Sequence, residues 1–125
     1  MASKQNKGLA RIYHAFFYSM AGLVSVWKNE IAFRQEIVVS IILIPIAFWL
    51  GQNAIQISLL ILPIFIVLIT ELLNSAIESA IDRISEEQHN LSKQAKDIAS
   101  AAVFISLLLF VVIWGLIIVD RYYPL

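Results

Sequence analysis

Residues 98–119, IASAAVFISLLLFVVIWGLIIV, form an uncharged and mostly apolar run that is long enough to cross a bilayer. A transmembrane helix needs about 17–25 such residues, because each residue advances the helix by about 1.5 Å across a hydrocarbon core of roughly 30 Å. Lipid offers no hydrogen-bond partners to an open backbone, so a single span of this kind must be helical. The run predicts a membrane-spanning helix and excludes most soluble folds for a chain of this length.

Two further segments have the same character. IVVSIILIPIAFWL is uncharged and, extended by about one turn at its start, predicts a span over 32–50 with Arg34 and Glu36 at the interface. After the short turn GQNA, a third apolar segment predicts a span over 54–82 whose last turns extend into water. The chain is 60% hydrophobic, above the roughly 45–50% of a typical soluble domain. The sequence therefore predicts one membrane domain.

The segment before the first span has a different pattern. Its large apolar residues recur at spacings of three and four, which is typical of an amphipathic helix lying in the membrane interface over 8–28. The alternative is an ordinary helix packed on a soluble core. With a cytoplasmic loop at 83–95 and the last span at 96–119, the predicted fold class is an all-α membrane protein with one surface helix and three spans.

Basic residues are distributed unevenly about these spans. Eight lie before the uncharged run of the first span or between the second span and the uncharged run of the last: Lys4, Lys7, Arg11, Lys28, Arg34, Arg83, Lys93 and Lys96. Only Arg121 lies on the opposite side. The positive-inside rule therefore predicts a cytoplasmic N-terminus, a cytoplasmic 83–95 loop and a C-terminus outside.

Charge and cysteine content narrow the classes of function. The formal net charge is zero, so no global field points to nucleic acid. The chain has no cysteine, which excludes disulfides, thiolate metal sites and cysteine nucleophiles. The N-terminus lacks a clean apolar core followed by a small-residue cleavage site, so no signal peptide is expected.

A polar stripe marks the cytoplasmic end of the second span. In ELLNSAIESAID, the residues Glu71, Asn74, Glu78 and Asp82 follow one another at spacings of three or four, which places them on one helical face. Polar groups at membrane depth are expensive to desolvate, so such a stripe is by default a candidate site. Glu71 should lie deepest and Asp82 in water.

Other polar residues approach the same boundary from the remaining segments. They are Glu30 and Glu36 from the first segment, and Glu86, Glu87, His89, Lys96 and Asp97 from the loop and the last span. Several carboxylates with no cysteine favour a hard divalent cation, above all Mg2+, which keeps waters and shares phosphate oxygens. Carboxylates, Mg2+ and a lysine together suggest phosphate chemistry on a molecule arriving from the membrane.

Each of these residues also has a purely structural interpretation. Glu78 and Asp82 are consistent with a solvated helix surface, and Glu71 with Asn74 are consistent with hydrogen bonding between helices. His89 fits a polar surface. The aromatic residues near the span ends are typical of interface anchors: Trp27, Trp49, Trp114, Tyr122 and Tyr123. The isolated glycines form neither a P-loop nor a protein-kinase glycine pattern.

Three motifs carry a family resemblance. WKNEIAFRQE (27–36), ELLNSAIESAIDRI (71–84) and AKDIASAAV (95–103) resemble the integral-membrane bacterial diacylglycerol kinases, in order and spacing, over roughly residues 8–119. The resemblance implies a homotrimer in the bacterial inner membrane that uses Mg-ATP to phosphorylate diacylglycerol to phosphatidic acid. The active site would be cytoplasmic, shared between protomers, and the C-terminus periplasmic.

The resemblance also implies roles for single residues. Glu71 would be the general base, with Asn74 positioning the lipid hydroxyl, while Glu30 and Glu78 would bind the metal. The implied nucleotide contacts are Arg11, Tyr18, Glu30, Glu78, Glu87, His89, Lys96 and Asp97. The implied lipid contacts are Glu36, Glu71, Ser100 and Trp114.

Two other functions remain open at the level of sequence. The undecaprenol kinases of the same family keep the acidic motifs and change the lipid; the loop DRISEEQHNLSKQAKD resembles the Gram-negative version and favours diacylglycerol. A non-enzymatic membrane protein with ion-relaying carboxylates is the alternative of a different class.

Overall fold

A computed structural model describes residues 7–84 and 90–125, and these residues form four helices and no strand. They are α1 (Leu9–Asn29), α2 (Ile31–Leu50), α3 (Ala54–Ile84) and α4 (Asn90–Tyr122). Three of them, α2, α3 and α4, are long and apolar enough to cross a membrane. The predicted all-helical class with three apolar spans is confirmed.

The helices extend further than the predicted spans. Residues 83–84 and 90–95, assigned to a loop from the sequence, are helical, and α4 continues past 119 to Tyr122. A helix satisfies its own backbone in water as well as in lipid, so the edge of an apolar run need not end it. Hydropathy alone therefore underestimates helix length here.

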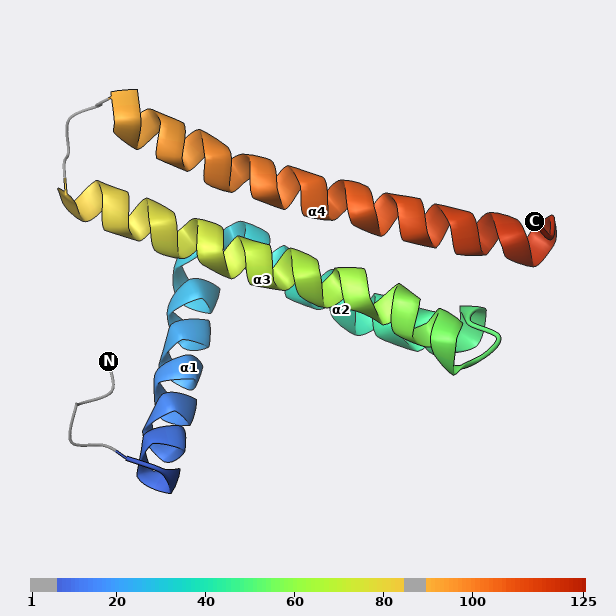
Figure 1. Cartoon of the computed structure of the whole chain (residues 1–125), viewed down its shortest axis with the longest axis horizontal. Helices are drawn as coiled ribbons and strands as arrows, with labels where there is room; N and C mark the ends of the chain where they lie inside the picture. The colour runs from blue at the N-terminus through green and yellow to red at the C-terminus, as the bar shows by residue number, and fades with distance from the viewer. Residues whose placement is uncertain (1–6, 85–89) are drawn as a thin grey trace.

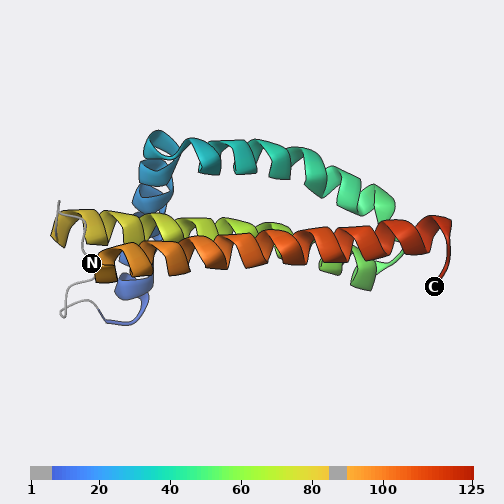
Figure 2. The ribbon, with the colours of Figure 1, turned by 90° about the horizontal axis from the view of Figure 1, so that it is seen from above.

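Figure 1 shows the arrangement of the helices. The antiparallel helices α3 and α4 lie side by side along most of their length, and they form the most extensive helix pair. In Figure 2, α2 lies on another side of α3, and α1 crosses steeply near the start of α2. The α1–α2 break and the C-terminal part of α3 therefore occupy one end of the bundle, whereas the α2–α3 turn and the C-terminus occupy the other.

Two short breaks redirect the chain. At Glu30 the backbone is extended (φ −121°, ψ 108°), although its N–H still donates to Val26 O at 2.8 Å. After α2, Gly51 permits a tight turn, because a Cβ there would lie 2.5 Å from a side-chain carbon of Ile57. Asn53 then caps α3, its Oδ1 accepting from the N–H of Gln56 at 2.9 Å.

Only a small apolar cluster is buried within one chain. Ala47, Leu50, Leu60, Ile64 and Trp114 pack together where α2, α3 and α4 meet. Most other large apolar side chains of the spans face outward, as expected for helices that contact lipid or further protein. Trp114, interpreted from sequence as an interface anchor, is buried at 7% exposure and stacks on Phe110. The anchor interpretation is wrong for this residue.

Hydrogen bonds join the spans at different positions along the bundle. Trp114 Nε1 donates to Leu60 O at 3.0 Å between α4 and α3. Near the middle of α3, the hydroxyl oxygens of Thr70 and Ser106 lie 3.0 Å apart. At the end of α2, Arg121 Nη1 donates to Leu50 O at 3.1 Å, which places a cation at a helix C-terminus.

The Thr70–Ser106 bond should contribute measurably to stability. Lipid is as apolar as leucine, so polar bonds and close packing must supply the association of membrane helices. A double-mutant cycle with Thr70→Val and Ser106→Ala should give a coupling of about 0.6 kcal/mol, the average for such bonds. The measurement is unfolding by denaturing detergent in mixed micelles. Ser58→Ala, on an exposed position of α3, is the control, and a coupling of zero would contradict the account.

Candidate functional site

The polar stripe of α3 runs from the protein interior into solvent. Glu71 is only 7% exposed, Asn74 and Glu78 are half-buried, and Asp82 is exposed. Each step is one helical turn, so depth changes steadily along a single face. The predicted order, with Glu71 deepest and Asp82 outermost, agrees with this gradient.

Carboxylates from three parts of the chain gather around Glu71. It lies close enough to Glu36 of α2, Glu30 at the α1–α2 break and Glu78 of its own helix for their charges to interact. Glu30 lies here because the chain leaves the helical conformation at that residue. The tertiary structure therefore brings together carboxylates that are as far apart in the sequence as Glu30 and Glu78.

Several polar atoms of this region lack a partner. Glu36 Oε2, Asn74 Oδ1 and Ser75 Oγ are buried and make no hydrogen bond within the described residues. Asn74 Nδ2 donates to Glu78 Oε1 at 3.3 Å. Buried polar groups are nearly always paired, so unpaired acceptors beside a carboxylate group suit a ligand.

The arrangement fits a magnesium ion that takes few protein ligands. Within residues 7–84 and 90–125, no three acidic or histidine side chains converge closely enough to form a complete cage. Mg2+ does not require one, because it keeps several waters and uses one or two carboxylates with substrate phosphates. Glu30 and Glu78, both near Glu71, supply donors of that kind.

Helix α4 adds charged residues at the same end. Lys96 Nζ donates to Asp82 Oδ1 at 2.5 Å, across the α3–α4 interface. Lys93 Nζ donates to Asp97 Oδ2 at 2.6 Å within α4. Both members of the predicted nucleotide pair thus have an ion-pair partner: Lys96 pairs with Asp82 of the stripe, and Asp97 pairs with Lys93, which the sequence did not assign to the site.

The remaining predicted residues are less closely grouped. Arg11 and Tyr18 are exposed on α1, and Ser100 is exposed on α4. Trp114 bonds to Leu60, which precedes Glu71 by about three turns, or roughly 16 Å along the axis. Glu87 and His89 lie outside the described residues.

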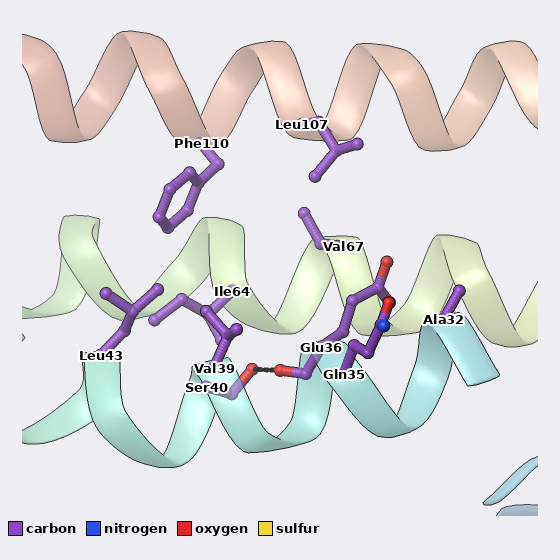
Figure 3. A pocket seen from close by; sticks show the side chains of 10 residues that line it. All are labelled: Ala32, Gln35, Glu36, Val39, Ser40, Leu43, Ile64, Val67, Leu107 and Phe110. Atoms are coloured by element: carbon purple, nitrogen blue, oxygen red, sulfur yellow. Dashed lines mark hydrogen bonds between the residues drawn. The ribbon is translucent and has the colours of Figure 1, made fainter.

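A largely apolar cavity of about 220 Å³ opens beside Glu36. In Figure 3, the Glu36 side chain lies at one end of it, and Leu107 and Phe110 of α4 face it from the opposite side. The other lining residues come from α2 and α3: Ala32, Gln35, Val39, Ser40, Leu43, Ile64 and Val67. An apolar space that ends at a carboxylate suits a ligand with a hydrocarbon part and a polar end.

Sequence reasoning missed two features of this site. Ser75 is buried and unpaired beside Asn74, but a serine in an apolar helix carries no distinguishing signal of its own. Asp82 was recognised in the stripe but received no role, because its partner Lys96 comes from another helix. Helical spacing places Asp82 on the face of the stripe, but it does not show which residue of another helix lies beside it.

Fold and site together define a small multi-span membrane protein with an acidic, lysine-containing site at one end of its helices. Such a site suits phosphate chemistry at a membrane boundary.

The sequence model of the family described as prokaryotic diacylglycerol kinase matches residues 17–118, so the chain belongs to this family. It is 47% identical to a diacylglycerol kinase of Haemophilus influenzae, over 86% of this chain and 92% of that protein. It is also 45% identical to one of Pseudomonas aeruginosa, over 92% and 94% of the two chains. An Escherichia coli diacylglycerol kinase is 47% identical over 89% and 91%. The family is that of the sequence resemblance, which is confirmed, and the chain is a kinase.

Because several carboxylates lie close together and repel one another, we expect this site to lower the free energy of unfolding. Glu36→Gln removes a charge beside Glu71 but keeps a similar shape, so it should stabilise the protein by about 0.5–2 kcal/mol, as relief of strain at active sites commonly does. Thermal unfolding in one detergent at neutral pH measures this. Asp120→Asn, a similar change at the opposite end of the bundle, should change stability little. A Glu36→Gln protein that unfolds more readily than the wild type would contradict the prediction.

Proposed function

We propose that this chain transfers the γ-phosphate of Mg-ATP to the hydroxyl of diacylglycerol and so produces phosphatidic acid. The observation that carries the proposal is the buried Glu71, surrounded by carboxylates at the deep end of a polar stripe, with a lysine from α4 at the shallow end. Membership of the prokaryotic diacylglycerol kinase family supplies the reaction.

Glu71 is the proposed general base. A primary alcohol must lose its proton as it attacks phosphorus, which needs a carboxylate within hydrogen-bond reach. Glu71 is the most buried carboxylate of the stripe, so it is the one that a hydroxyl arriving from the membrane meets first. Asn74, one turn away, has a second Nδ2 hydrogen besides the one that it donates to Glu78, and this hydrogen can be donated to the hydroxyl oxygen and orient it.

Glu30 and Glu78 are the proposed metal ligands, and they approach Glu71 from two different segments. When bound, Mg2+ would offset the charge that spreads over the oxygens of the transferring phosphoryl group. The two carboxylates themselves place negative charge at the position where the metal and the phosphates would bind. Glu78 accepts a hydrogen bond from Asn74 Nδ2, so the residue proposed to orient the lipid hydroxyl also orients a proposed metal ligand.

The nucleotide site is proposed to include Lys96 and Asp97 of α4, with Arg11 and Tyr18 of α1. Lys96 brings a positive charge beside Asp82 and Glu78, which suits phosphate oxygens. Glu87 and His89 complete the set that the family resemblance implies.

The lipid is proposed to lie with its glycerol end at Glu36 and Glu71 and with part of an acyl chain in the cavity of Figure 3. This orientation follows from the chemistry of the cavity walls, which are apolar except near Glu36 and Gln35. Ser100 and Trp114 are the other proposed lipid contacts. Trp114 bonds to Leu60, which lies three helical turns before Glu71 on α3, so its contact would be with the acyl part of the lipid.

We further propose that the enzyme is a homotrimer in the bacterial inner membrane, with the N-terminus and the site in the cytoplasm and the C-terminus in the periplasm. The uneven distribution of lysine and arginine supports the orientation. Helix α1 buries no residue within a single chain and exposes Leu9, Ile12 and Phe16, among others. This exposure supports a place at the membrane surface, where an amphipathic helix lies.

The function is tested by transfer of labelled phosphate from ATP in mixed micelles, with diacylglycerol and undecaprenol offered separately. Magnesium-dependent label should appear in phosphatidic acid and disappear with chelator. Label mainly in undecaprenyl phosphate would assign the protein to the other lipid. No label in either lipid, from a protein with intact helices, would return the acidic stripe to a structural or ion-relaying role.

A further inference from the structure

The ion pair between Lys96 and Asp82 joins two helices at the edge of the acidic site. The atoms Nζ and Oδ1 lie 2.5 Å apart, and their residues belong to α4 and α3. Among the ion pairs within residues 7–84 and 90–125, it is the one that connects different helices. It therefore fixes where the Lys96 ammonium lies relative to α3.

Asp82 holds this ammonium beside Glu78, one of the two proposed metal ligands. It lies one helical turn beyond Glu78, and Lys96 is also close enough to Glu78 for their charges to interact. A lysine side chain has four rotatable carbons and would otherwise sample many positions. The pair with Asp82 keeps it directed across the helix interface, toward the stripe.

We propose that Asp82 is a positioning residue for nucleotide binding that acts through Lys96. The inference rests on the proposed kinase function. An ammonium has three N–H donors, and Asp82 accepts from one of them, so Lys96 can bind a phosphate oxygen while it stays paired. Asp82 has no contact with substrate in this account; it sets the place at which the phosphates meet a positive charge.

Two other roles for the pair make different predictions. Asp82 is 65% exposed and Lys96 40% exposed in their side chains, and many exposed pairs contribute nothing measurable. Alternatively, Asp82 competes with phosphate for the ammonium, in which case its removal would tighten nucleotide binding. The direction of the change in ATP affinity separates the three possibilities.

The test compares wild type with Asp82→Asn and Asp82→Glu in mixed micelles. Asp82→Asn should raise KM for ATP and the dissociation constant of a fluorescent ATP analogue by about threefold to fivefold, in line with the energies of partly exposed pairs. The KM for diacylglycerol and the unfolding midpoint should not change. Asp82→Glu, which keeps the charge, should restore most of the affinity. An unchanged or lower KM for ATP would overturn the proposal.

A second substitution shows whether the effect passes through Lys96. In a Lys96→Met background, Asp82→Asn should not weaken analogue binding further; an additional loss there would mean that Asp82 contacts the nucleotide itself and would also overturn the proposal. Asp120→Asn, at the opposite end of the bundle, is the matched control and should keep wild-type affinity. A wild-type protein without kinase activity would instead refute the proposed function, so the two failures are distinguishable.

Discussion

The architecture depends on the pairing of α3 with α4, because this pair brings the two halves of the site together. Lipid supplies no hydrophobic drive for helices to associate, so specific bonds must fix the register. Two do so along the pair: Trp114 to Leu60 and Thr70 to Ser106. A sliding of α4 by one turn would move Lys96 by about 5.4 Å relative to the stripe. The same bonds that hold the helices together therefore align the charged groups.

The position of Glu71 follows from the cost of placing a charge in hydrocarbon. A carboxylate is tolerated where α3 approaches the membrane boundary and where protein rather than lipid surrounds it. Glu36, Glu30 and Glu78 meet it there, and Glu30 does so from the α1–α2 break. Such crowding opposes stability, and proteins accept it at functional sites. In the proposed mechanism this crowded position is where Glu71 would accept the proton of the lipid hydroxyl.

Much of this could be predicted from the sequence, for identifiable reasons. The apolar runs of α2, α3 and α4 are long and nearly free of charge, so their helices were predictable from lipid physics alone. The stripe from Glu71 to Asp82 followed from helical periodicity. Contacts between elements did not: neither the pairing of Lys96 with Asp82 nor the burial of Trp114 is encoded in local spacing. The start of α4 also escaped prediction, because residues 90–95 are helical where hydropathy gives no signal.

The most direct test of the central claim is a single-turnover measurement of phosphate transfer by Glu71→Gln with Mg-ATP and diacylglycerol already bound. General-base catalysis contributes about 10²–10⁴-fold, so the transfer rate should fall by that factor while both substrates bind as in the wild type. A Glu71→Gln protein that transfers phosphate within a few-fold of the wild-type rate would contradict the account, since the buried carboxylate would then have no part in the chemistry.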